Sequence, residues 1–379
     1  MSDARKQMLS DEERLNWLRL IRSDNVGPVT FHDLLNHFGN ASDAIDALPD
    51  LSSRGGRRRF SVYPAEKAQS ELEEATRWGA SLAAHGEPAY PSRLARIDAP
   101  PPLIYVKGET GLLAKPIVAI VGARNASAIG QKFTRTIARD LGAQGFVIAS
   151  GLARGIDTAA HIAALDAGTV SVLAGGINSI YPPENEELHQ KIGTQGVLVS
   201  EMPFGYRQRG QDFPRRNRII AGVCAGVIVV EAAKRSGSLI TARLAGEMGR
   251  EVFAVPGNPL DPRAAGANAL LRDGAGLAVC ADDVIQTLKP ILGQEFAGGP
   301  APMPNREDLP PTPAEIDEPD RAQVLSALGT SPVDIDELVR ATNLSVRQVQ
   351  IALLELDLAG RLQRHGNQMV SLAGGEGAD

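Results

Sequence analysis

The feature that most constrains the fold of this chain is an alternation of short apolar runs and amphipathic segments that begins at Pro116. Six runs are rich in Val, Ile and other apolar residues: Ile117–Val121, Phe146–Ile148, Val170–Leu173, Val197–Val199, Val227–Val230 and Val252–Val255. Most of them are separated by amphipathic helical patterns, such as 131–143 and 156–167. Strands that are apolar throughout must be covered on both faces. The alternation therefore predicts a doubly wound α/β domain with a parallel sheet over residues 111–292.

Smaller domains are predicted on both sides of this α/β domain. Residues 1–110 show the periodicity of amphipathic helices, and Asn25–Thr30 is typical of the tight connection in a helical hairpin. Residues 293–319 are rich in proline, which predicts an extended linker. Within 320–379, helical segments are followed by a hairpin with its turn at Gly366-Asn367, an order typical of a winged-helix domain.

The charge of the chain is distributed unevenly. The net charge is −6 and the isoelectric point is near 5.6, which by itself argues against a polyanionic partner. However, residues 115–290 carry 19 Lys and Arg against 15 Asp and Glu, a net charge of +4. Residues 291–379 carry 6 against 14, a net charge of −8. The α/β domain is thus basic, and the acidity belongs mainly to the linker and the C-terminal domain.

Several classes of protein are disfavoured by simple counts. The two cysteines, Cys224 and Cys280, lie in apolar contexts and are too few for a disulfide framework or a CxxC zinc site. The N-terminal residues 1–15 lack the apolar segment of a signal peptide. The longest apolar stretch, Ile219–Val230, is shorter than the ~20 residues of a membrane span. We therefore expect a cytoplasmic protein that has neither a bound metal nor a membrane anchor.

Three predicted strand-to-helix turns combine small residues with a basic side chain. They are VGARNAS (121–127), SGLARGID (150–157) and EAAKRSGSLIT (231–241). Because the carboxyl ends of parallel strands share one edge of the sheet, where helix N-termini converge, these turns predict a long anion-binding groove. None reads GxGxxG or GxxxxGK[ST], so a dinucleotide site or a P-loop is disfavoured and no cofactor is expected.

A stretch rich in arginine adds positive charge to the same domain. Its members are Arg207, Arg209, Arg215, Arg216 and Arg218, opposed locally only by Asp212. The guanidinium group offers a planar set of donors that matches phosphate oxygens in pairs, so this stretch favours a phosphate-binding role over that of a solvated surface loop.

Catalytic patterns are weak in this sequence. No HExxH or GxSxG motif occurs. Asp157 is more typical of a helix cap than of an acid or base, and His161 more typical of a structural helix residue. Glu201 and Glu231 each follow a predicted strand, but no second group completes a catalytic pair. We expect a binding protein with no catalytic residues.

Seven motifs run through the α/β domain in a fixed order. They are VGARNAS (121–127), SGLARGIDTAAH (150–161), LAGGINSIYPPEN (173–185), SEMPFG (200–205), FPRRNRIIAG (213–222), VVEAAKRSGSLITARLA (229–245) and VPGNP (255–259). Together they resemble the DNA processing protein A (DprA/Smf) family. The flanks agree, since the N-terminal helices resemble the family's sterile-alpha-motif-like domain and the tail resembles its winged-helix (DML1-like) domain.

The resemblance implies an extended Rossmann-like fold that binds single-stranded DNA, acts as a homodimer and loads the recombinase RecA during natural transformation. By resemblance, Gly246–Gly276 is a dimer surface. The winged helix departs from a duplex-binding pattern, because its recognition helix offers only Arg347 as a basic residue. Duplex binding would therefore lack the usual release of counterions, and we expect this domain to serve protein contact or regulation.

The groove and the resemblance together predict a set of DNA-binding residues. These are Gly122, Arg124, Ser127, Gly151, Arg154, Gly155, Arg209, Arg215, Arg216, Asn217, Arg218, Lys234, Ser236, Gly237 and Ser238. Aromatic residues are scarce at 4%, and only Phe204, Tyr206 and Phe213 lie near the arginine-rich stretch. We therefore expect phosphate contacts to dominate and binding to depend steeply on salt.

Two alternatives remain open. A Rossmann-like nucleoside-monophosphate phosphoribohydrolase would use a glycine-rich turn beside a catalytic Glu, but the turn at 236–241 is followed by Ala242 and Arg243. A transcription factor would act through the winged helix, whose acidity weakens that alternative.

Overall fold

The computed structural model describes residues 8–57, 59–297, 316–365 and 368–373. The chain forms two compact units, one built mainly from Glu71–Met303 and the other from Leu9–Ser70 together with Pro304–Asp379. Residues 298–315, which hold most of the predicted proline-rich linker, lie outside the described residues, as does the predicted hairpin turn at Gly366-Asn367.

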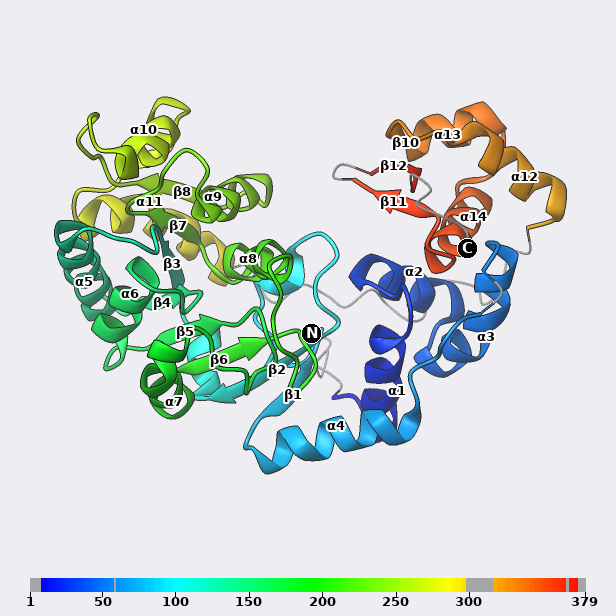
Figure 1. Cartoon of the computed structure of the whole chain (residues 1–379), viewed down its shortest axis with the longest axis horizontal. Helices are drawn as coiled ribbons and strands as arrows, with labels where there is room; N and C mark the ends of the chain where they lie inside the picture. The colour runs from blue at the N-terminus through cyan, green and yellow to red at the C-terminus, as the bar shows by residue number, and fades with distance from the viewer. Residues whose placement is uncertain (1–7, 58, 298–315, 366–367, 374–379) are drawn as a thin grey trace. The chain divides into compact units, whose positions relative to one another are not determined.

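The first unit contains a nine-stranded sheet with the strand order β1-β2-β6-β5-β4-β3-β7-β8-β9 (Figure 1). The strands are β1 (Ser81–Ala84), β2 (Leu103–Gly108), β3 (Ile117–Val121), β4 (Val147–Ser150), β5 (Thr169–Val172), β6 (Val197–Ser200), β7 (Gly226–Val229), β8 (Glu251–Ala254) and β9 (Gly276–Leu277). From β6 to β9 all neighbouring strands are parallel. Each of the six apolar runs forms a strand within two residues of its expected limits, so the predicted doubly wound α/β fold is confirmed.

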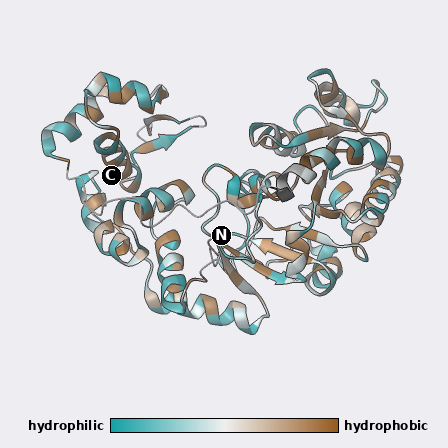
Figure 2. Ribbon diagram, turned by 180° about the vertical axis from the view of Figure 1, so that it is seen from behind, coloured by the Kyte–Doolittle hydropathy of each residue, from teal (hydrophilic) through white to brown (hydrophobic). Residues whose placement is uncertain are grey.

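Helices cover both faces of this sheet (Figure 1). They are α5 (Ala128–Ala143), α6 (Ile156–Ala164), α7 (Glu186–Gln195), α8 (Asp212–Val223), α9 (Gly237–Glu247), α10 (Ala265–Arg272) and α11 (Ala281–Ala297). Side chains alternate along each strand, so that Ala119 and Val121 of β3 pack with α8 and α9 while Val118 and Ile120 pack with α5 and α6. The hydropathy colouring of Figure 2 shows the resulting apolar strands between the covering helices.

The sheet also contains three strands that periodicity alone did not predict, namely β1, β2 and the short β9. β1 and β2 lie within the region expected to be purely helical, yet β2 pairs with β6 in an antiparallel ladder and β1 pairs with β2. The first compact unit accordingly begins at Glu71 instead of at residue 111. The link is polar as well as apolar, since the buried Tyr105 hydroxyl donates a 2.8 Å hydrogen bond to Glu71. Four short 3-10 helices complete this unit: Leu94–Arg96, Thr110–Ala114, Pro183–Asn185 and Pro262–Ala264.

The second unit combines the N-terminal helices with the C-terminal winged helix. Its elements are α1 (Asp11–Arg22), α2 (Pro28–Phe38), α3 (Ala41–Arg54), the start of α4 (Ala65–Arg77), α12 (Glu318–Ala327), β10 (Val333–Asp334), α13 (Ile335–Thr342), α14 (Val346–Leu358), β11 (Leu362–Arg364) and β12 (Met369–Leu372). Ser345 forms a capping box with Gln348 at the start of α14, as its position before an amphipathic run predicts. The three strands and α12–α14 confirm the winged-helix fold.

The recognition helix of the winged-helix domain, α14, is packed against α2 and α3. A Cβ atom added to Gly55, directly after α3, would lie 2.0 Å from the carbonyl oxygen of Glu355 in α14. The Asn25 amide donates to the carbonyl oxygen of Leu358 at 2.9 Å, and the Thr30 hydroxyl donates to Asp357 at 2.9 Å. The helical hairpin and the recognition helix are therefore bound to each other.

Candidate nucleic-acid interface

A cavity of about 900 Å³ lies at the carboxyl ends of the strands in the first unit. Strand order reverses between β3 and β7, which are neighbours in the sheet although β4, β5 and β6 separate them in sequence. Ligands of open α/β sheets bind outside the strand ends at such a switch point. Of the predicted residues, the following line the cavity: Gly122, Arg124, Arg209, Arg216, Asn217, Ser236, Gly237 and Ser238.

Glycines in the first two turns allow the turns to pack against each other. Gly155 has a φ of +79°, and a Cβ atom there would lie 2.3 Å from the carbonyl oxygen of Ala123. That carbonyl accepts a 3.2 Å hydrogen bond from the backbone N–H of Ile156, and a Cβ atom at Gly122 would lie 2.6 Å from the Ile156 side chain. Contact between the turns explains these glycines without any ligand.

The second turn is closed by an internal carboxylate. Asp157 is buried in the first turn of α6 and accepts hydrogen bonds of 3.2 Å from the backbone N–H groups of Gly151 and Ala153. Burial raises the pKa of Asp157, while the charge of Arg216 and these hydrogen bonds oppose the rise. This N-terminus therefore already holds an anion supplied by the protein.

Arg216 lies inside the protein, with only 6% of its surface exposed. Its guanidinium group donates to the carbonyl oxygens of Gly151 and Val172. Burial lowers the pKa of Arg216 to about 10, a change that the charge of Asp157 opposes. Although Arg216 borders the cavity floor, its donors are directed at the backbone, so it supports the second turn.

Arg215 and Arg218 of α8 are both paired with Glu201, which directly follows β6. The Nε group of Arg215 donates to Glu201 at 3.0 Å, and Arg218 forms a short ion pair with the same buried carboxylate. Neither Arg215 nor Arg218 belongs to the described residues that line the cavity. A helix rotates successive side chains by about 100°, so adjacent arginines in sequence must face different surroundings.

The exposed arginine Arg124 lies in the first turn, with its guanidinium carbon 5.1 Å from the ring centre of Phe213. Phe213 in turn contacts Tyr181, with ring centres 5.6 Å apart. All three side chains line the cavity, as does the exposed Arg209. An arginine above an aromatic surface offers both a phosphate donor and a stacking platform.

The third turn starts α9 without an acidic residue in its first helical turn. Ser236 is the N-cap and accepts from the backbone N–H of Ser238 at 3.4 Å. The Asn217 amide donates to the carbonyl oxygen of Gly237 at 3.3 Å, which joins α8 to this turn. Lys234 and Arg235 are both exposed, and Arg235 lines the cavity.

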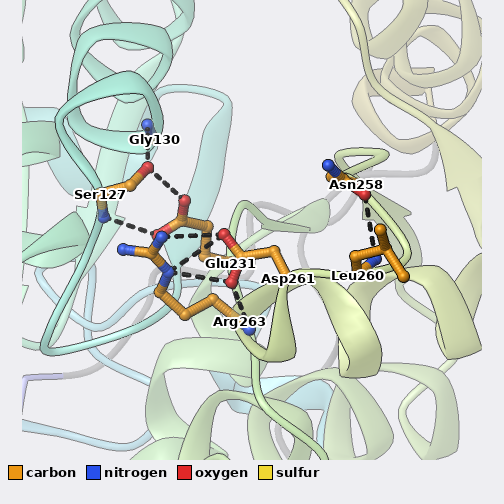
Figure 3. Close-up of polar contacts among 7 residues, drawn as sticks. All are labelled: Ser127, Gly130, Glu231, Asn258, Leu260, Asp261 and Arg263. Carbon is orange, nitrogen blue, oxygen red and sulfur yellow. Dashed lines mark hydrogen bonds and ion pairs between the residues drawn. The ribbon is translucent and has the colours of Figure 1, made fainter.

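The remaining predicted residues lie elsewhere. Arg154 is exposed and forms an ion pair with Glu184 at 2.5 Å. Ser127 is the N-cap of α5, and its side chain and backbone N–H are bound to Glu231 (Figure 3). The structure also describes Lys234, Gly151 and Gly155, but none of them lines the cavity.

Several cavity residues were not predicted from the sequence. They include Tyr181, Gln208, Arg235, Ile240, Thr241 and Arg263. Arg235 could have been found beside Lys234, but Arg263 follows β8 in a turn with no glycine-rich signal. Of the three aromatic residues expected near the groove, Phe213 lines it, whereas Phe204 packs on Trp78 and Tyr206 donates to Asp212.

The described residues lack two features, a cluster of metal-ligating side chains and a helix that could cross a membrane. Within the described residues, no group of three or more His, Cys, Asp or Glu side chains is arranged to hold a metal ion. In the same part of the chain, no helix has the length and apolar character that crossing a bilayer requires.

A doubly wound sheet whose switch-point cavity carries exposed arginines around an aromatic pair defines a Rossmann-like binder of large anionic ligands. The chain belongs to the DNA processing protein A (DprA/Smf) family. Residues 81–289 match the family model for DNA recombination-mediator protein A. Residues 11–74 match the DprA-like N-terminal HHH domain, and residues 308–368 match the DprA winged helix domain.

Some curated relatives match nearly the whole chain, and others match about half of it. Protein Smf from Synechocystis is 32% identical and covers 93% of this chain and 97% of its own length. DNA processing protein DprA from Streptococcus pneumoniae is 46% identical over 52% of this chain and 70% of its own length.

Two solved structures are similar in fold as well as in sequence. The structure of DprA from S. pneumoniae superposes with a TM-score of 0.64 at 34% identity, covering 74% of this chain and 99% of that one. A structure of DNA processing protein A from Helicobacter pylori, described by its single-stranded DNA binding mode, has a TM-score of 0.51 at 31% identity. It covers 56% of this chain and 96% of that one.

Proposed function

We propose that this protein binds single-stranded DNA in the switch-point cavity and acts as a non-enzymatic recombination mediator. The observation that carries the proposal is the placement of exposed Arg124 and Arg209 beside the Tyr181–Phe213 pair in one cavity. Phosphates would be held by arginine, while the aromatic rings would receive bases that are free to leave a stack. The H. pylori relative is described as binding single-stranded DNA, which supports this choice of ligand.

Single strands suit this cavity better than duplex. The bases of a duplex are paired and stacked, so they are not free to contact Phe213 without being extruded. The helix that would enter a major groove, α14, is packed against α2 and α3. Its acidic domain would also lack the favourable release of counterions. We therefore assign DNA binding to the first unit.

The candidate residues take three roles in this proposal. Arg124, Arg209 and Lys234 contact phosphates, and Ser236, Gly237 and Ser238 offer backbone and hydroxyl donors at the start of α9. Gly122, Gly151, Gly155, Arg216 and Asn217 shape the turns. Arg154, Arg215 and Arg218 make no contact with DNA in this proposal, because the charge of each is balanced by a paired carboxylate.

The proposal extends to biological partners. We infer that the protein acts in the cytoplasm as a homodimer, protects incoming single strands and loads RecA during natural transformation. The family model, which describes a recombination mediator, supports this role. A strand-exchange assay in which RecA competes with a single-strand-binding protein tests loading, and sedimentation of the full chain tests dimerisation.

The decisive experiment measures binding of labelled single- and double-stranded oligonucleotides of equal length across a salt series. Single strands should bind more tightly, with the logarithm of the affinity falling linearly with the logarithm of salt concentration. Arg124→Ala and Lys234→Ala should each weaken binding about tenfold and reduce the slope by about 0.7. Arg243→Ala is the matched control, because Arg243 is an exposed arginine of α9 that pairs with Glu247.

Three results would overturn the proposal: equal affinity for single strands and duplex, unchanged binding by both variants, or an equal loss in Arg243→Ala. The phosphoribohydrolase alternative is tested in parallel, by measuring release of ribose phosphate from nucleoside monophosphates.

A further inference from the structure

Glu231 is the second residue after β7, at the point where strand order reverses. Its carboxylate accepts a 2.9 Å hydrogen bond from the backbone N–H of Ser127 and a 2.5 Å hydrogen bond from the Ser127 hydroxyl. Figure 3 shows this carboxylate directed at the turn between β3 and α5. One side chain thus joins the first glycine turn to the strand that leads into the third.

The start of α5 is built around this carboxylate. Ser127 is the N-cap, and its hydroxyl oxygen also accepts from the backbone N–H of Gly130 at 2.9 Å. A Cβ atom at Gly130 would lie 2.6 Å from Cδ and 2.7 Å from Oε1 of Glu231. Any larger residue at position 130 would therefore displace the carboxylate. The helix N-terminus, which favours negative charge, is occupied by an anion of the protein's own.

A basic residue lies on the other side of Glu231. Arg263, in the short 3-10 helix after β8, pairs with Asp261 at 2.8 Å (Figure 3). The pKa of Arg263 is raised mainly by that hydrogen-bonded carboxylate and further by the charge of Glu231. Arg263 also lines the cavity. Glu231, in the segment that follows β7, therefore lies between the segments that follow the two neighbouring strands, β3 and β8.

A carboxylate beside an anion-binding cavity has an electrostatic cost. Through charge alone, Glu231 repels every phosphate nearby, so its removal would strengthen DNA binding. The contacts to Ser127 have the opposite effect. They fix the end of the Gly122–Ser127 turn, and that turn carries Arg124 three residues before Ser127. The two effects predict opposite signs for the same substitution.

We propose that Glu231 is a positioning residue of the DNA cavity, which holds the Gly122–Ser127 turn so that Arg124 faces the ligand. It acts through Ser127 and makes no contact with DNA. This inference rests on the proposed function, because its ligand is the single-stranded DNA of that proposal.

The first test replaces one carboxylate oxygen by an amide group in the full chain. Glu231→Gln loses one of the two acceptors for Ser127 and also loses a negative charge. We expect single-stranded DNA to bind about fivefold more weakly, despite the more favourable charge. Glu247→Gln is the matched control, since Glu247 is an exposed carboxylate on α9 that pairs with Arg243. Binding that is unchanged or stronger in Glu231→Gln overturns the inference.

The second test asks whether Glu231 acts through Arg124. In the Arg124→Ala background, Glu231→Gln should have little further effect, and each single variant should reduce the salt slope by a similar amount. Additive losses overturn the inference, because they would mean that Glu231 supports binding by another route. General destabilisation also gives additive losses, so this readout separates positioning from a stability effect.

The third test needs no DNA. Hydrogen exchange of the peptide that covers 122–130 should be faster in Glu231→Gln and in Gly130→Ala than in the natural protein, with no change in Glu247→Gln. Unchanged exchange overturns the inference even if the proposed function holds. If the natural protein fails to bind single strands while exchange responds as expected, the proposed function fails and the clamp on the turn remains.

Discussion

Arg216 donates a hydrogen bond of 2.8 Å from Nη1 to the carbonyl oxygen of Gly151, inside the larger unit. The same nitrogen donates to Val172, and Nε donates to Asn217 at 3.2 Å. An arginine from α8 therefore ties the end of β4 to the end of β5. Because Asp157 binds the N–H groups of the same turn, the second glycine turn is held by one buried cation and one buried anion.

Removing Arg216 should cost much more stability than its position beside a cavity suggests. In Arg216→Met, two carbonyl oxygens lose their donor and the buried Asp157 carboxylate loses the nearby positive charge, so we expect unfolding free energy to fall by about 3–5 kcal/mol. Adding Asp157→Asn should restore part of the loss, because the uncompensated charge is then removed. Urea denaturation of the single and double variants measures both effects. A double variant less stable than Arg216→Met would contradict this electrostatic interaction between the two residues.

Arg215 and Arg218 should matter for stability more than for DNA. Arg218→Ala leaves the buried Glu201 with one partner fewer, and we expect a loss of about 1–3 kcal/mol. Both Arg215→Ala and Arg218→Ala should bind single-stranded DNA within about twofold of the natural protein, against about tenfold weaker binding for Arg124→Ala. Fluorescence anisotropy at fixed salt provides the comparison. A tenfold loss in either variant would place that side chain at the DNA.

Protonation of His161 should destabilise the protein below neutral pH. His161 is fully buried and donates or accepts a 2.7 Å hydrogen bond with Thr169, and burial lowers its pKa to about 3. In the unfolded chain the pKa is about 6.5, so the unfolded state binds the proton first. Stability is therefore retained above pH 6.5 and declines as the pH falls toward 3, by about 1.4 kcal/mol per unit.

The variant His161→Gln isolates this contribution. Between pH 7 and pH 5, the natural protein should lose about 2 kcal/mol more unfolding free energy than the variant. Urea denaturation at the two pH values measures the difference. Equal losses in the two proteins would show that His161 is not buried in its neutral form.

Substitution of Gly55 should destabilise the second unit without changing DNA binding in the cavity of the first unit. A Cβ atom at this position would overlap the carbonyl oxygen of Glu355, and overpacking of this kind costs about 1–3 kcal/mol. Gly55→Ala should therefore lower the unfolding temperature of the second unit. Gly27→Ala is the control, because nothing lies within 4 Å of a Cβ atom there. Affinity for single-stranded DNA should stay the same in both, since the cavity belongs to the first unit.

Local sequence patterns predicted much of this fold. The apolar runs at β3 to β8 are long enough and sufficiently Val- and Ile-rich to specify buried strands, and the intervening periodicity specifies helices. The turns that follow β3, β4 and β7 were located correctly, because a parallel sheet brings strand ends to one edge. By contrast, β1 and β2 join the sheet through pairing with β6, a partner far away in the sequence.

The sequence by itself determined where positive charge is concentrated: in the α/β domain, with arginines gathered between 207 and 218. Only the tertiary structure decided which arginines face the cavity. Arg209 is exposed there, Arg216 is buried against the backbone, and Arg218 is paired with Glu201. The physical reason is that the sequence shows only where the arginines occur along the chain. The direction of each side chain depends on its position around the helix and on carboxylates that other parts of the chain supply.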